Sequence, residues 1–236
     1  MSHTTPDPSK RTARRTLDSR LRGVCLRRSE QRLESGSRAP TTAGRVARPA
    51  EEVRILSGDS TDIRLSVAGN PSQNNAGEHN LPGGEVFTAP VIDSVEGQAL
   101  FDKPVHRDGR AVTDARLQFE DGEVTDYAVT KNESLLGEII ATDAGVRRLC
   151  EIGIGMTRDI DRFSYNMLFD EKIGDTVHMA LGRAYEDAVD PDNKHNQSAV
   201  HVDMVVDMSE NSFIVVDDET IQRDGRFVFD RVDNNA

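Results

Sequence analysis

The chain has 236 residues, of which 36% are apolar and 30% charged, enough for one sizeable hydrophobic core or two small ones. The longest uninterrupted run of aliphatic and aromatic side chains is Phe213–Val216, far short of the ~20 residues that a membrane-spanning helix needs. The net charge is −12, and we expect a polar globular protein without a membrane partner.

The first fifty residues differ in charge from the rest of the chain. Residues 1–50 contain 12 Lys and Arg against 4 Asp and Glu, a charge of +8, whereas residues 51–236 contain 17 against 37, a charge of −20. We interpret residues 1–50 as a basic, disordered arm, because apolar residues are too sparse there to build a core. A tail that binds nucleic acid, an organellar transit peptide and a mistaken start or frame are the alternatives. No aromatic residue between the arginines offers a surface for base stacking, so we expect no nucleic-acid partner.

Composition also indicates the compartment. The acidic remainder is rich in Asp and poor in Lys, and salt screens the self-repulsion of such a surface. We interpret this as a hint of a halophile with a high-salt cytoplasm, although an ordinary acidic protein has the same features. Cys25 and Cys150 form neither a disulfide framework nor a zinc-type spacing, and the N-terminus has no apolar signal segment. We therefore expect a cytoplasmic protein.

Short β-like runs begin at Val53. Ile63–Val67 alternates apolar and polar residues, as a half-buried strand does, and Asn70–Gly84 is rich in Asn, Gly and Pro and is predicted to be a loop. Turns are predicted at Asp108-Gly109 and Asp121-Gly122. The other strands predicted in this half are Val86–Ile92, Gln98–Phe101, Ala115–Phe119 and Val124–Val129. This spacing indicates a meander or a barrel.

The second half adds a helix and more strands. Ser134–Leu149 carries apolar residues at helical spacing, with a break expected at Gly145. The strands predicted here are Glu151–Met156, Thr176–Leu181, Ala199–Met204 and Phe213–Val216, and Phe227–Phe229 closes the chain. We therefore predict one domain over residues 51–236, of the α+β class, built on a curved, barrel-like, mostly antiparallel sheet with a few helices.

Five side chains that can bind metal lie in these elements. His201 and Asp203 are two residues apart on a predicted strand, so they point to the same face. His178 lies in an apolar strand, and Glu85 and Glu151 begin apolar strands, where a carboxylate needs a partner. Taken singly, each has an ordinary explanation: a packed core histidine, a His–Asp pair on a solvated face, or a Glu paired with Arg. Together, five oxygen and nitrogen donors without a thiol favour two divalent ions, Zn, Co or Mn, about 3.5–4 Å apart.

Tyr185 is a candidate proton donor. A small-residue bend at Gly182 follows the strand of His178 and would bring Tyr185 close to it. A phenol in that place can donate a hydrogen bond to a developing oxyanion.

Four segments taken together resemble one family. They are His79–Pro90 with Asp93–Gly97, then Asp143–Glu151, Phe169–Tyr185 and Asn196–Asp203. Over roughly residues 53–232 the chain is similar to the thermophilic metalloprotease family of aminopeptidases, the group of aminopeptidase T, aminopeptidase S and PepS. The resemblance implies a metal-dependent aminopeptidase that hydrolyses the N-terminal peptide bond of peptides with a water activated by two metal ions, and a homodimer.

The resemblance also implies roles for single residues. It makes Glu85, Glu151, His178, His201 and Asp203 metal ligands. Tyr185 matches the catalytic tyrosine, and Glu171 either binds metal or supports a ligand. We further expect Glu85 or Glu151 to bridge the two ions and carry the proton, which makes Glu151 the second catalytic candidate.

Two departures from the family pattern leave alternatives open. The family carries an α/β domain before the first motif, which we expect to be absent here, and Cys150 adjoins Glu151 where a small residue is expected. The alternatives are an inactive fragment of such an aminopeptidase that binds metal or dimerises without turnover, another metal-dependent hydrolase with the same ligands, and a nucleic-acid-binding protein acting through residues 1–50.

Overall fold

The computed structural model describes residues 49–77, 82–107 and 109–229. The arm expected over residues 1–50 therefore lies outside the described residues up to position 48, as does Asp108 of the predicted Asp108-Gly109 turn. Within the described ranges no helix is both long and apolar enough to cross a membrane.

The strands of the described residues form two sheets and a small hairpin. The larger sheet contains β1 (Glu52–Ser57), β2 (Thr61–Ser66), β5 (Glu96–Phe101), β8 (Ala115–Glu120), β9 (Glu123–Ala128), β13 (Ser212–Val216), β14 (Glu219–Arg223) and β15 (Arg226–Phe227). The smaller sheet contains β3 (Gln73–Asn75), β4 (Glu85–Thr88), β10 (Leu149–Gly155), β11 (Thr176–Gly182) and β12 (His201–Asp207). The hairpin pairs β6 (Val105–Arg107) with β7 (Arg110–Val112).

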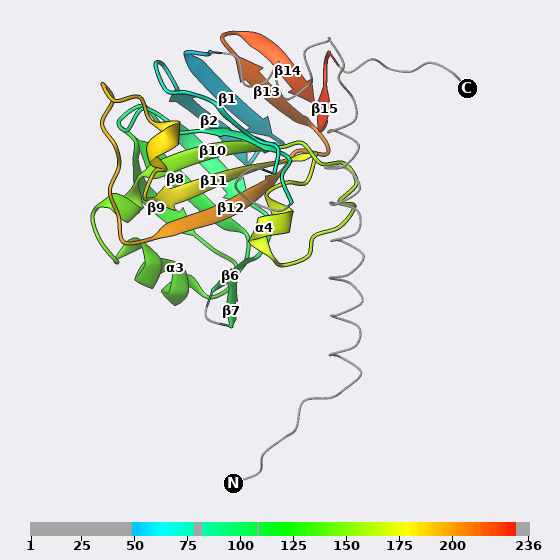
Figure 1. Cartoon of the computed structure of the whole chain (residues 1–236). Coiled ribbons are helices and arrows are strands. Elements are labelled where there is room, and N and C mark those ends of the chain that lie inside the picture. Colours follow the sequence, from blue (N-terminus) through cyan, green and yellow to red (C-terminus); the bar gives the residue numbers. More distant parts are fainter. Residues whose placement is uncertain (1–48, 78–81, 108, 230–236) are drawn as a thin grey trace.

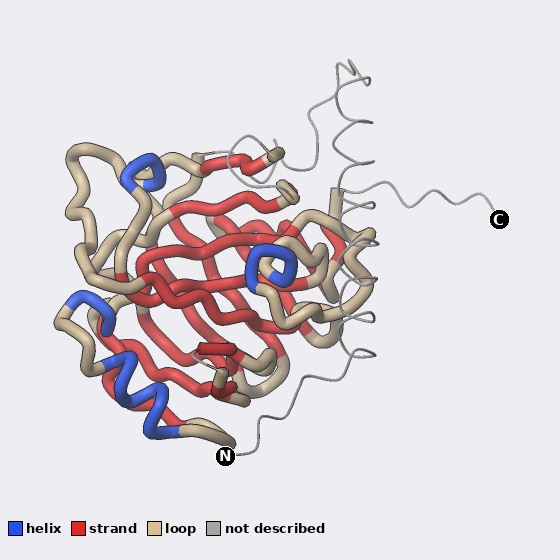
Figure 2. Tube along the Cα trace, turned by 60° about the horizontal axis from the view of Figure 1, so that its bottom comes forward, coloured by secondary structure: helices blue, strands red, loops and turns tan. Residues whose placement is uncertain are grey.

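The strand orders are β15-β14-β13-β1-β2-β5-β8-β9 in the eight-stranded sheet and β12-β11-β10-β4-β3 in the five-stranded sheet, and every pairing between these strands is antiparallel. The two curved sheets lie face to face, with the hairpin below them in Figure 1. Among the described residues helices are few: α3 (Glu133–Ile140) lies at the edge of the strands, and the single turn of α4 (Met167–Asp170) lies in front of them in the view of Figure 2. The predicted α+β class with a curved, mostly antiparallel sheet is confirmed.

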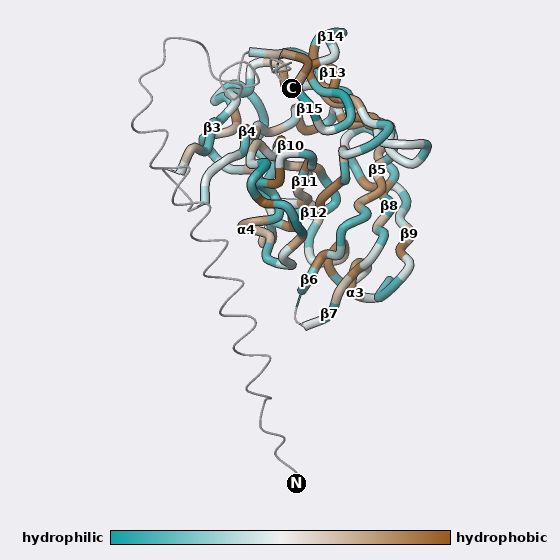
Figure 3. Tube along the Cα trace, turned by 90° about the vertical axis from the view of Figure 1, so that its right-hand side faces the viewer, coloured by the Kyte–Doolittle hydropathy of each residue, from teal (hydrophilic) through white to brown (hydrophobic). Residues whose placement is uncertain are grey.

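The core lies between the sheets because the strands alternate in polarity. In β8 the side chains of Ala115, Leu117 and Phe119 are buried while their neighbours are polar, and this alternation of brown and teal is visible in Figure 3. The five-stranded sheet contributes a matching apolar face, which includes Val177 and Met179 of β11. Burial of these side chains removes apolar surface from water at roughly 25 cal/mol per Å², which is the main term that holds the sheets together.

Several predicted elements differ from the structure. The loop predicted for Asn70–Gly84 contains β3, which pairs with β4. The helix predicted for Ser134–Leu149 ends at Ile140, a short 3-10 turn covers Gly145–Arg147, and Leu149 begins β10. The predicted turn at Asp121-Gly122 is confirmed: both residues have positive φ, as a type I′ hairpin requires.

Candidate metal centre

The polar face of the five-stranded sheet gathers the predicted ligands. Glu85 lies opposite Gly155 in the register of β4 and β10, and His178 lies opposite Gly153 in that of β10 and β11. Ala180 of β11 lies opposite both Glu151 and Asp203. Residues opposite each other in adjacent strands point to the same face, so these side chains share the face that turns away from the apolar core.

The ligands are close to one another. His178 Nε2 is 3.2 Å from Glu151 Oε1 and 3.6 Å from Glu85 Oε2. His201 Nε2 is 3.1 Å from Asp203 Oδ1 and 3.7 Å from Glu151 Oε2. Glu151 therefore lies between the two histidines and turns one oxygen to each.

Tyr185 lies beside this cluster. Its ring centroid is 4.9 Å from that of His201 and 6.1 Å from that of Phe87, and the side chain is 45% exposed. Burial raises the pKa of its hydroxyl, so Tyr185 stays protonated and able to donate at neutral pH. A cavity of about 290 Å³ opens here; its lining residues are Asn75, Glu85, Phe87, Glu151, Glu171, Tyr185, Asp187, His201 and Asp203.

Two residues of the site were not anticipated from the sequence. Lys172 is fully buried, and its Nζ donates to Glu85 Oε1 at 2.7 Å and to Glu171 Oε1. Asn75 Nδ2 donates to the same Glu85 oxygen at 2.8 Å. The Asp-Glu-Lys segment that contains Lys172 is part of the third motif, but a lysine beside an acidic residue is ordinarily a surface residue, so spacing alone did not place it in the site.

Negative charge dominates the cluster. Burial by itself lowers the pKa of His178, but the hydrogen bond that its ring donates to Glu151 and the charges of Glu85, Glu151 and Glu171 raise it to about 9. For His201, burial also acts downward, and the hydrogen bonds with Asp203 and Cys150 and the charges of these two groups together outweigh it and raise the pKa to about 12. The cluster thus gathers four carboxylates, those of Glu85, Glu151, Glu171 and Asp203, around the lysine Lys172, an excess of negative charge that bound cations would balance.

These residues fit divalent cations. Two groups each bring ligand atoms within 4.8 Å of one another: Glu85, Glu171 and His178, and Glu151, His178 and Asp203. Glu85 Oε2 and Glu151 Oε2 are buried without a hydrogen-bond partner among the described residues. Buried carboxylate oxygens left without a donor are costly, and carboxylate oxygen with imidazole nitrogen is a donor set that Zn, Co and Mn accept. The structure thus brings all five predicted ligands, Glu171 and Tyr185 to one place.

Glycine in β10 makes room for the imidazole. A Cβ built on Gly153 would lie 2.1 Å from His178 Cε1 and 2.2 Å from its Nε2, so any side chain there displaces the ring. We expect Gly153→Ala to lower metal affinity by about 10–100-fold, the effect that misplacing a ligand typically has.

Calorimetric titration of metal into the chelated variant measures this effect. Gly137→Ala is the matched control, because its added Cβ meets only the Tyr127 hydroxyl, at 3.0 Å, on the other sheet. Wild-type affinity in Gly153→Ala would show that His178 does not bind the metal.

Comparison with known proteins identifies relatives. A family model described as thermophilic metalloprotease (M29) matches residues 47–227. The chain is 33% identical over 141 residues to aminopeptidase 2 of Geobacillus stearothermophilus, covering 54% of this chain and 34% of that protein. It is 30% identical over 198 residues to aminopeptidase AmpS of Bacillus subtilis, covering 72% of this chain and 48% of the relative.

Two solved structures share the fold. AmpT from Thermus thermophilus superposes with a TM-score of 0.65 at 28% identity, covering 76% of this chain and 50% of that one. A 2,5-dihydroxypyridine dioxygenase from Pseudomonas putida gives a TM-score of 0.61 at 18% identity, covering 76% of this chain and 55% of the other, which shows a common fold alone.

The chain spans between a third and a half of the length of these curated relatives. The family model nevertheless covers most of the chain, including every candidate ligand. The chain belongs to the thermophilic metalloprotease (M29) family.

Proposed function

We propose that this chain carries the metal centre of an aminopeptidase that removes the N-terminal residue of peptides. The observation that carries the proposal is Glu151, which turns one oxygen to His178 and the other to His201 at the floor of the Tyr185 cavity. One carboxylate can then serve two cations. The aminopeptidase names of the relatives favour peptide substrates.

The residues divide into two sets of ligands. Glu85, His178 and Glu151 Oε1 would hold one ion, and Glu151 Oε2, His201 and Asp203 the other. Lys172 binds both Glu85 and Glu171, so we assign Glu171 to the support of the first set. Two divalent ions in such a site lower the pKa of a water molecule and polarise a carbonyl group.

The chain's own side chains would do the rest. Tyr185 O–H would donate to the oxygen of the scissile carbonyl as negative charge develops on it. Glu151, which lies between the two sets of ligands, would take up the proton of the attacking water and pass it to the leaving nitrogen. Glu171 and Asp187 line the same cavity and would attract the substrate's free ammonium group, which would restrict hydrolysis to chain ends.

Metal titration and turnover test this function together. We expect protein stripped with a chelator to bind two equivalents of Zn²⁺, Co²⁺ or Mn²⁺ and then to hydrolyse leucine p-nitroanilide, and His178→Ala to lose both properties. Two bound equivalents without turnover would instead support the inactive-fragment alternative. Cleavage of an ester panel with no cleavage of amides would favour a different hydrolase.

The assembly and compartment remain part of the proposal. We propose a cytoplasmic homodimer, as the family resemblance implied. Sedimentation equilibrium of the loaded protein decides between one and two copies, and a single copy at micromolar concentration would contradict the dimer.

A further inference from the structure

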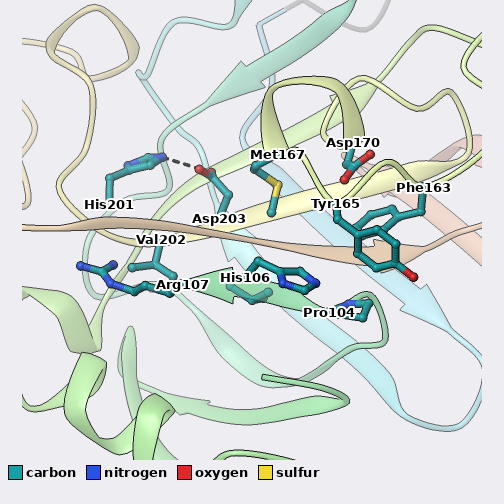
Figure 4. A pocket seen from close by; sticks show the side chains of 11 residues that line it. Pro104, His106, Arg107, Phe163, Tyr165, Met167, Asp170, His201, Val202 and Asp203 are labelled. Carbon is teal, nitrogen blue, oxygen red and sulfur yellow. Dashed lines mark hydrogen bonds and ion pairs between the residues drawn. The ribbon is translucent and has the colours of Figure 1, made fainter. Parts of the chain in front are cut away.

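A second cavity adjoins the metal centre at the open edge of the five-stranded sheet. Its volume is about 190 Å³, and His201 and Asp203 of the edge strand β12 line both cavities. The rest of its wall comes from Val202 of β12, from the β6 segment, from α4 and from the loop before α4 (Figure 4), and includes His106, Arg107, Phe163, Tyr165, Met167 and Asp170. A substrate held at the metal centre therefore has a second compartment directly beside it.

The wall of this cavity is aromatic at one end. Phe163 and Tyr165 meet edge to face with ring centroids 5.5 Å apart, and Tyr165 meets His106 in the same way at 5.1 Å. Tyr165 is 62% exposed and has a φ of +59°, a conformation that a bulky residue adopts only when its surroundings hold it there. Together with Met167, this end offers a surface for an apolar side chain.

Asp170 fixes the loop that carries the aromatic wall. Its Oδ1 accepts hydrogen bonds from the backbone N–H and the hydroxyl of Ser164, both at 2.7 Å. Its Oδ2 is buried without a hydrogen-bond partner among the described residues, and burial raises the pKa of this carboxyl group. Asp170 therefore shapes the cavity at the end that Phe163 and Tyr165 form.

Arg107 is the charged group at the other end, on the side of His201 in Figure 4. Of the half-buried arginines that the structure describes, Arg54, Arg147 and Arg148 bond to oxygen atoms of the protein, whereas Arg107 has no such partner. Residues 51–236 carry a charge of −20, so carboxylates that could pair with an arginine are abundant. Arg107 lies close to the metal ligands and pairs with no carboxylate of the described residues, so its guanidinium is available to a bound molecule. A guanidinium binds a carboxylate with two parallel hydrogen bonds.

We propose that this cavity binds the leaving part of the peptide, with its carboxylate on Arg107 and its side chain against Phe163, Tyr165 and Met167. The proposal rests on the proposed function, because it places the scissile bond at His201 and Asp203. In a dipeptide the C-terminal carboxylate lies two bonds beyond the scissile nitrogen, so a cation close to the metal ligands suits a dipeptide better than a long chain. An acidic side chain on the leaving residue is the other source of the same group.

The first experiment uses the metal-free protein and no turnover. Calorimetry compares N-acetyl-L-phenylalanine with N-acetyl-L-phenylalaninamide, which differ only in the carboxylate. We expect the wild type to bind the acid at least about tenfold more tightly than the amide, since hydrogen bonds to charged groups have that strength. We expect Arg107→Met to bind the acid and the amide with equal affinity. Arg107→Lys should keep part of the preference. Equal binding of acid and amide by the wild type would overturn the proposal.

A matched control lies on the same hairpin. Arg110 is exposed, pairs with Glu138 at 3.0 Å and does not line the cavity. Arg110→Met removes the same charge and should keep the wild-type ratio of acid to amide. If Arg110→Met also lost the preference for the acid over the amide, the preference would depend on the net charge of the protein, and a specific site at Arg107 would be contradicted.

Turnover by the metal-loaded wild type then separates the two proposals. Hydrolysis of leucine p-nitroanilide tests the proposed function alone, because that substrate has no carboxylate. The value of kcat/KM is then compared for Leu-Phe, Leu-Phe-amide and Leu-Glu-amide. A preference for Leu-Phe would assign the site to a C-terminal carboxylate, and a preference for Leu-Glu-amide would assign it to an acidic side chain. Equal kcat/KM for all three, with p-nitroanilide hydrolysis intact, would refute the Arg107 site while leaving the proposed function in place.

Discussion

Tyr185→Phe is expected to lower kcat for leucine p-nitroanilide by about 10²–10³, the usual effect of removing one donor to an oxyanion. The substitution removes only a hydroxyl, and the ring contacts with His201 and Phe87 can persist. Because the hydroxyl stabilises the transition state more than the bound substrate, KM should change little. Steady-state kinetics of the loaded enzyme measure both constants.

Metal content and fold act as controls for this variant. Tyr185 is not placed among the ligands, so two equivalents of metal should still bind and the thermal midpoint should stay within the wild-type range. Tyr127→Phe, on β9 of the other sheet, is the matched control and should keep full activity. Undiminished turnover in Tyr185→Phe would remove this residue from the mechanism.

Lys172→Met is expected to have the largest effect on stability. Lys172 is fully buried between Glu85 and Glu171, and removal of one partner from a buried ion pair typically costs about 3–5 kcal/mol, because the other charge is left buried and uncompensated. Bound metal also supplies positive charge to Glu85, so the loss should be smaller in saturating Zn²⁺ than in a chelator. Urea unfolding under both conditions gives the two free energies.

Lys103→Met sets the scale for that measurement. Lys103 pairs with Asp207 at 2.6 Å but is 27% exposed, so water can partly replace the lysine. We expect a loss of about 1 kcal/mol or less, with no dependence on metal. If Lys172→Met lost no more than this, or lost the same amount with and without Zn²⁺, the coupling between Lys172 and the metal centre would be disproved.

Local sequence patterns were sufficient to predict most strands and to identify the candidate metal ligands. Alternation predicted β2, a short β-like run between turns predicted β8, and the Asp121-Gly122 pair predicted the hairpin turn, because these signals depend on neighbours in sequence. His201 and Asp203 share a face for the same reason, since a strand repeats every two residues. The order of the four segments then indicated the family.

Short elements escaped such patterns. β3, β6 and β7 each have only three residues, too few for a period to be visible. The helix pattern of Ser134–Leu149 ran past Ile140 because Val146 of the 3-10 turn and Leu149 of β10 continued its spacing. The missed strand β6 carries Arg107, and so the cavity that Arg107 lines could not be foreseen.

The sequence by itself determined which donors the protein has and that they lie on apolar strands, because residue type and period are local properties. Only the tertiary structure decided that Lys172 enters the site and that Glu151 lies between two histidines. The same holds for Arg107, which shares a cavity with His201. The contact of His178 with Glu151 joins residues 27 positions apart in the sequence, and that of Lys172 with Glu85 joins residues 87 positions apart. Contacts over such sequence separations depend on how whole strands pair and pack.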